Sequence, residues 1–260
     1  SGATGTRVAT IAAANTCNGA LIAFRDAPYT ISGSVFEDIH YGGGAGRSRA
    51  AAAGVGVGGV RVELYNGSGI FLDSTTTAAD GSYTFTSINA GSYHVRVVGD
   101  TVASTRVGSS AAVKGVPSFR TDASTGAALA VTDFVGGTQP ALTEAGSGAA
   151  GSVFNTATGV FTAGPSGTAQ AYAPVQVSTA NVTAVDFGYT FSTVSNANDS
   201  GPGSLRQAIA NANALGNDAA LAQAGRSAGI EHLIFMISNG STGGGGALGL
   251  AGGLRSSINL

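Results

Sequence analysis

Short runs of alternating apolar and polar residues, separated by turn-forming residues, constrain the fold of this chain more than any other feature. Residues 60–65 read Val-Arg-Val-Glu-Leu-Tyr, so every second side chain is apolar and shares one face of a strand. Residues 82–85 and 93–97 alternate in the same way, and the turn signal Asn66-Gly67 follows the first run. This spacing predicts an antiparallel β-sandwich over residues 31–100, whose inward side chains include Tyr83, Phe85, Tyr93, Val95 and Val97.

The middle of the chain carries weaker strand patterns. Between residues 101 and 193 we expect an additional β region with Gly/Ala/Ser/Thr-rich loops, and the candidate strands are residues 102–107, 127–134, 175–177 and 184–191. The stretch 144–170 fits an extended wrap, a long loop or an insertion. The Gly- and Ala-rich stretch 42–59 lacks periodicity and predicts a flexible loop. We expect residues 1–30 to be a leader with short apolar segments that could be strands.

The last region, residues 194–260, changes character. A helix is predicted over 204–214, because its apolar residues fall on one stripe: Leu205, Ala208, Ile209, Ala212 and Leu215. Ser204 can cap the start of this helix. A second short helix is predicted over 218–224. The continuous apolar run 233–237 is typical of a strand buried on both faces, as in parallel sheets.

Composition limits the classes of function. Only 10% of the residues are charged, against about 25% in an ordinary globular domain, and Lys114 is the single lysine. The net charge of −2 gives no footprint for nucleic acid, and no apolar run is long enough to span a bilayer. One cysteine, Cys17, excludes an internal disulfide. The chain starts at Ser1 without a signal peptide, which suggests a mature product or a fragment.

Residues 31–98 resemble the prealbumin-like B repeats of Gram-positive adhesins, the Cna-B/SdrD-B group. The matching pieces are residues 33–38, 60–65, 75–85 and 91–97. The resemblance implies a seven-stranded sandwich that serves as a spacer or stalk. In that group an acidic calcium loop follows the first strand, but this chain keeps only Glu37 and Asp38 there. Calcium takes six to eight oxygen ligands, so we expect no bound metal. Some members also carry a Lys–Asn isopeptide crosslink from an early strand, and since Lys114 lies beyond the module we expect none here.

Residues 194–209 resemble the opening of right-handed parallel β-helix proteins, with Asn-Asp-Ser-Gly-Pro-Gly-Ser-Leu-Arg at 198–206 and a following strand at 232–237. In that family the amphipathic helix caps the open end of the β-helix core. Together the two modules resemble large β-helix surface proteins of Gram-negative bacteria.

No catalytic, cofactor-binding or metal-binding residues are predicted. His40, His94 and His232 have no metal-type spacing partner, and no nucleophile elbow or phosphate loop occurs. The carboxylates of Asp122, Asp133 and Asp186 are isolated in the sequence, which leaves no acid–base pair.

These observations favour a secreted, non-enzymatic structural or adhesive component of the bacterial cell surface or extracellular matrix, with a fibre or sheath subunit as one form. The alternatives are the stalk or N-terminal part of a β-helix enzyme acting on polysaccharide, and a carbohydrate-binding module. Candidate partners are copies of the chain, other surface proteins and extracellular polysaccharide. We also expect residues 233–237 and 258–260 to carry unpaired strand groups that a neighbouring copy could pair with.

Overall fold

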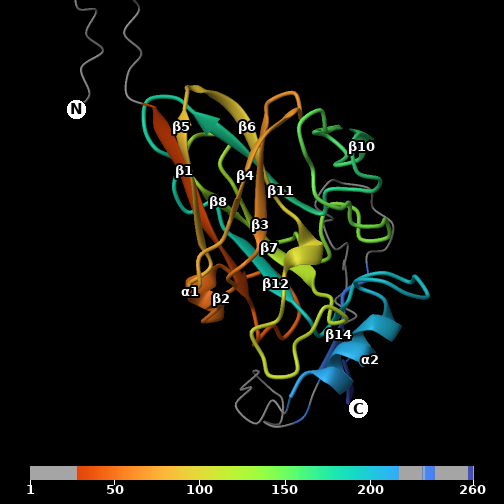
Figure 1. Ribbon diagram of the computed structural model, residues 1–260. Coiled ribbons are helices and arrows are strands. Elements are labelled where there is room, and N and C mark those ends of the chain that lie inside the picture. The colour runs from red at the N-terminus through yellow and green to blue at the C-terminus, as the bar shows by residue number, and fades with distance from the viewer. Residues whose placement is uncertain (1–27, 217–229, 231, 238–256, 260) are drawn as a thin grey trace, which may run out of the picture.

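The computed structural model describes residues 28–216, 230, 232–237 and 257–259. It is mainly β, as predicted, and only a few short helices accompany the strands (Figure 1). The strands are β1 (Tyr29–Glu37), β2 (Val55–Gly56), β3 (Arg61–Asn66), β4 (Phe71–Thr76), β5 (Ser82–Ile88), β6 (Gly91–Val97), β7 (Val116–Asp122), β8 (Leu129–Val131), β9 (Val153–Phe154), β10 (Phe161–Ala163), β11 (Ala171–Val177), β12 (Phe187–Thr190), β13 (Thr193–Val194), β14 (His232–Phe235) and β15 (Ser257–Asn259). The helices are α1 (Arg49–Ala52), the 3-10 helix η1 (Gly99–Thr101) and α2 (Leu205–Ala214).

Two sheets face each other in a sandwich. The six-stranded sheet has the order β2-β1-β12-β7-β8, with β5 paired to the N-terminal half of β1. The four-stranded sheet has the order β11-β6-β3-β4. Neighbouring strands within these two sheets are antiparallel, except that β1 and β12 are parallel.

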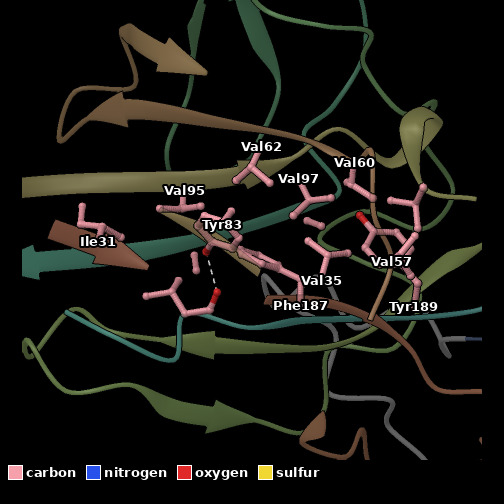
Figure 2. Close-up of a cluster of buried hydrophobic side chains, with 14 of the residues drawn as sticks. Ile31, Val35, Val57, Val60, Val62, Tyr83, Val95, Val97, Phe187 and Tyr189 are labelled. Carbon is pink, nitrogen blue, oxygen red and sulfur yellow. Dashed lines mark hydrogen bonds between the residues drawn. The ribbon is translucent and has the colours of Figure 1, made fainter. Parts of the chain in front are cut away.

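The core lies between the two sheets, where the inward side chains of the alternating runs meet (Figure 2). Val62 and Leu64 of β3 and Val95 and Val97 of β6 are at most 2% exposed, and Tyr83 and Phe85 of β5 face them. The predicted inward faces are therefore confirmed. Each such aliphatic or aromatic side chain contributes roughly 1.5–3 kcal/mol when it is fully buried.

The strands that follow residue 100 lie within the same two sheets. β7, β8 and β12 belong to the six-stranded sheet, and β11 is an edge of the four-stranded one. Strands were predicted at 127–134, 175–177 and 184–191, and β8, β11 and β12 confirm them with shifted bounds. The division into regions 1–30, 31–100, 101–193 and 194–260 stays a prediction.

Three details differ from the sequence-based expectation. Residues 102–107 form no strand, because Ser104 and Thr105 donate instead to the Glu37 carboxylate. β7 was not predicted, and its Pro117 is tolerated because it faces Tyr189 where the register of β12 shifts. The stretch 42–59 contains α1 and β2, and Ala52 of α1 packs on Phe36 and Phe119 outside the six-stranded sheet.

The predicted helix over 204–214 is present as α2. The Ser204 hydroxyl accepts a hydrogen bond from Gln207 N and caps the helix. The apolar stripe is only half buried: Ala208 and Leu215 are covered, whereas Leu205 and Ile209 are 40% and 37% exposed. The helix is turned because its polar Asn211 lies at the contact with the sandwich.

β14 is buried on both faces, as the apolar run predicted. Leu233 packs with Val194 and Ala208, while Ile234 and Met236 pack on Tyr41 of the sandwich. The strand pairs with β13 in parallel and with β15 in antiparallel register, and Met236 N donates to Val194 O. The expectation of unpaired strand groups at residues 233–237 and 258–260 is therefore wrong for residues 233–236 and for the edge of 258–259 that faces β14. The predicted leader, Cys17, the helix over 218–224 and residue 260 lie outside the described residues.

Candidate functional site

The outer face of the four-stranded sheet carries a connected group of charged and aromatic side chains. In β3 the core-facing residues Val62 and Leu64 alternate with outward-facing Arg61, Glu63 and Tyr65. The Gly/Ala/Ser/Thr-rich stretch 144–170 covers this face, so Glu63 and Tyr65 are removed from solvent, whereas the Arg61 side chain stays 32% exposed.

Arg96 of β6 is the centre of a buried charge cluster, which we define as Arg61, Glu63, Arg96 and Glu144. The Arg96 side chain is 0% exposed and bonds Glu63 at 2.9 Å and Glu144 at 2.8 Å. Arg61 bonds the other oxygen of Glu63 at 2.8 Å. Two cations thus face two carboxylates, which is how a buried charge is normally compensated.

The same cluster holds the covering stretch in place through backbone groups. Arg96 donates to the carbonyls of Ala145 and Gly146, and Arg61 donates to the carbonyl of Gly148. The N–H of Gly148 in turn donates to Glu63 at 2.7 Å. The sequence allows an extended wrap, a long loop or an insertion for this stretch, and these contacts show that its start packs directly on the sheet.

Burial shifts the titration of two members of this region. Burial raises the pKa of the Glu144 carboxyl to about 7, and the Arg96 guanidinium offsets only part of this effect. Burial also raises the pKa of the Tyr65 hydroxyl, which donates to Glu63 at 2.7 Å. Perturbed groups of this kind occur at active sites, but they also occur in structural ion-pair networks.

An aromatic cluster continues the covered face. Tyr65 lies edge-on to Phe154 with ring centroids 4.8 Å apart, and Arg96 lies 4.9 Å over the ring of Phe161. His94 packs against Phe154 and Tyr172, and burial lowers the pKa of its imidazole. The rings of Phe154 and Phe161 come from the hairpin of β9 and β10, so this hairpin closes the face.

Glu37 and Asp38, which stand where the Cna-B/SdrD-B group has its calcium loop, are already paired. Both side chains are buried, and Glu37 accepts from the Ser104 and Thr105 hydroxyls and from Thr105 N and pairs with Arg106 at 3.4 Å. Asp38 is paired with Arg47. A calcium ion would have to displace two guanidinium groups and two hydroxyls, so this donor set does not fit the ion. Among the residues that the structure describes, no group of three His, Cys, Asp or Glu side chains could hold a metal.

The other residues considered in the sequence do not come together. Lys114 forms an ion pair with Asp100 at 3.2 Å. Asp186 accepts from the backbone and hydroxyl of Ser34, and His232 is buried in β14.

A small cavity is lined by residues from the segments 99–100, 114–117, 140–144 and 198–202. Its volume is about 90 Å³, well below the roughly 300–1,000 Å³ of small-molecule pockets.

The sequence did not single out Glu63, Arg96 or Glu144. A signal was available, because Arg61, Glu63, His94 and Arg96 alternate with core residues on two strands that pair directly. Charges at that density on one face indicate that something covers or pairs them. The position of Glu144 carried no such signal.

Residues 29–133 match the family model of the SdrD B-like domain. Domains of this type are non-enzymatic structural repeats of adhesin-like surface proteins. No curated protein matches the chain. Within the described ranges, no helix has the length and apolar character needed to cross a bilayer.

Proposed function

We propose that this chain is a non-enzymatic, load-bearing structural or adhesive part of a bacterial cell-surface or extracellular-matrix protein. The observation that carries the proposal is the parallel ladder between β1, near the start of the described chain, and the segment that ends in β12. Val35, Phe36 and Glu37 pair in register with Phe187, Gly188 and Tyr189.

This ladder extends along most of β1. Ser32 N donates to Val182 O, Val185 N donates to Ser32 O, and Asp38 N donates to Tyr189 O. Because the strands are parallel, a force that pulls the two chain ends apart slides one strand lengthwise past the other. All ladder bonds then share the load, whereas an unzipping geometry would break them one at a time.

The match of residues 29–133 to the SdrD B-like domain supports the same role, since such domains are structural repeats of surface proteins. The stretch 144–170 adds a layer on the four-stranded sheet, and the buried charge cluster holds the start of this stretch on β3 and β6. We further propose that α2 caps the first turns of a β-helix. Its Ala208 packs on Val194 and Leu233 of the parallel pair β13 and β14, which supports this reading.

Single-molecule pulling between the two chain ends tests the load-bearing role. Ser32→Pro removes one N–H of the parallel ladder and lowers the unfolding force. Thr76→Pro is the matched control, because Thr76 is exposed on an edge strand, where proline is tolerated. Equal unfolding forces for the wild type and Ser32→Pro would contradict the proposal.

The location and assembly parts of the proposal need separate tests. An antibody against the chain labels intact, unpermeabilised cells of the producing bacterium if the chain is at the surface. Electron microscopy of the purified chain then distinguishes a fibre or sheath subunit from a stalk. Labelling only after permeabilisation contradicts the surface location.

A further inference from the structure

The free edge of β5 is the one sheet edge in the described part of the sandwich that lacks a protective device. β5 spans Ser82–Ile88 and pairs only with β1, beside which it lies in Figure 1. Exposed edge strands are normally protected by charges, proline, covering segments or very short length. Residues 81–93 contain no charged side chain and no proline.

The other edges show such devices. On β4, the Asp73 carboxylate accepts the backbone N–H of Ser74 at 2.7 Å. The edge of β11 is closed by Ala123, which exchanges hydrogen bonds with Pro174 and Gln176. β8 and β2 are only three and two residues long.

The direction of the backbone groups on β5 follows from the ladder. Ser32 bonds the 182–185 segment, so its neighbours Ile31 and Gly33 bond β5 through Phe85 and Tyr83. The N–H and C=O of Thr84 therefore point away from β1, and by the same alternation those of Thr86 do too. Outside the strand ladders, no backbone hydrogen bond of these groups occurs within the residues that the structure describes.

We propose that this edge pairs with the same edge of a second copy of the chain. In antiparallel register about a two-fold axis at Phe85, Thr84 of one copy lies opposite Thr86 of the other. The flanking Ser82 is unsuited, because its N–H is bound by Asp80 and its C=O by Ala78 N. Donors and acceptors of Thr84 and Thr86 then meet in two hydrogen-bonded pairs, which joins the six-stranded sheets edge to edge.

The side chains suit this partner. Ser82, Thr84 and Thr86 are exposed and project on the outer face, while Tyr83 and Phe85 stay in the core. Cross-strand threonine pairs are favourable, and no like charges face each other. The contact is short, because the pairing of β1 and β5 shifts between Tyr29 and Ile31 and ends the regular edge near residue 86. The dimer is therefore weak and forms at high local concentration, as on a crowded surface.

Sedimentation of the full chain from micromolar to millimolar concentration measures the dimer. Thr84→Lys/Thr86→Lys places like charges opposite each other and weakens dimerisation about tenfold or more. Thr84→Lys/Thr86→Glu places opposite charges in the same register and keeps the wild-type affinity within about threefold. Thr76→Lys adds the same charge on β4 and leaves the dimer unchanged.

A wild-type chain that stays monomeric up to millimolar concentration overturns the proposal. It is also overturned if Thr76→Lys weakens the dimer as much as the double lysine variant, or if the Lys/Glu pair fails to restore it. Circular dichroism of each variant checks that the exposed substitutions leave the fold intact. The inference rests on strand pairing alone, so a monomeric result leaves the load-bearing role and its pulling test unaffected.

Discussion

Glu144 makes the stability of this protein depend on pH in a direction opposite to that of most carboxylates. The side chain is buried beside Arg96 under the covering stretch, and burial raises its pKa from 4.5 to about 7. The charged and titratable groups around it are Arg96, Glu63 and the buried Tyr189.

The sign follows from proton binding. Between about pH 4.5 and 7 the folded chain keeps the Glu144 proton, whereas the unfolded chain has lost it. The folded state therefore binds more protons in this window, and the free energy of unfolding falls as the pH rises. The contribution is complete below about pH 4.5 and is lost as the pH passes 7. At about 1.4 kcal/mol per pKa unit, its full size is roughly 3 kcal/mol.

Urea unfolding followed by far-UV circular dichroism from pH 4.5 to 8.5 measures this dependence. Glu144→Gln keeps the shape and an acceptor for Arg96 but cannot titrate, so we expect its stability to fall less between pH 5 and 7.5 than that of the wild type. Asp199→Asn is the control, because this carboxylate is 85% exposed. If Glu144→Gln and wild type show the same slope, the assignment of the slope to Glu144 is wrong.

Four further predictions concern the Arg96 ion pairs, the contact of α2, the Glu37 and Asp38 carboxylates and Lys114. Above pH 7, where Glu144 is ionised, Arg96→Met leaves two buried carboxylates without their shared cation and lowers the free energy of unfolding by about 3–5 kcal/mol, measured by urea unfolding. Asn211→Ala removes the bonds from α2 to Lys114 N, Lys114 O and Phe191 O and costs about 2–4 kcal/mol in the same assay, whereas exposed Asn213→Ala costs little. Calcium and a chelator both leave the melting temperature unchanged, because Arg106 and Arg47 already pair with the carboxylates of Glu37 and Asp38; a rise with calcium contradicts this. Intact mass spectrometry gives the full sequence mass, whereas a loss of ammonia or water would reveal an amide crosslink at Lys114.

The regular parts of the fold could be predicted because their information is local. Alternation over residues 60–65 places Val62 and Leu64 inward, and a capping serine before an apolar stripe places α2. The failures occurred where a distant partner decides the outcome. A strand was expected at residues 102–107, but the N–H and hydroxyl of Thr105 and the hydroxyl of Ser104 donate to the buried Glu37 carboxylate instead. No pattern in the sequence around Glu144 predicts its contact with Arg96, which lies 48 positions away.

Many of the few charged side chains in this chain are used in ion pairs that hold loops on strands. Eight charged side chains form three buried or partly buried groups: Arg61, Glu63, Arg96 and Glu144; Glu37 and Arg106; and Asp38 and Arg47. Each group ties an irregular, Gly- or Ser-rich segment to a strand, because such segments bury too little apolar surface to be held by packing alone. Charges used in this way are no longer available at the surface, where they would discourage association. The composition that anchors the loops therefore also leaves the edge of β5 open to a second copy.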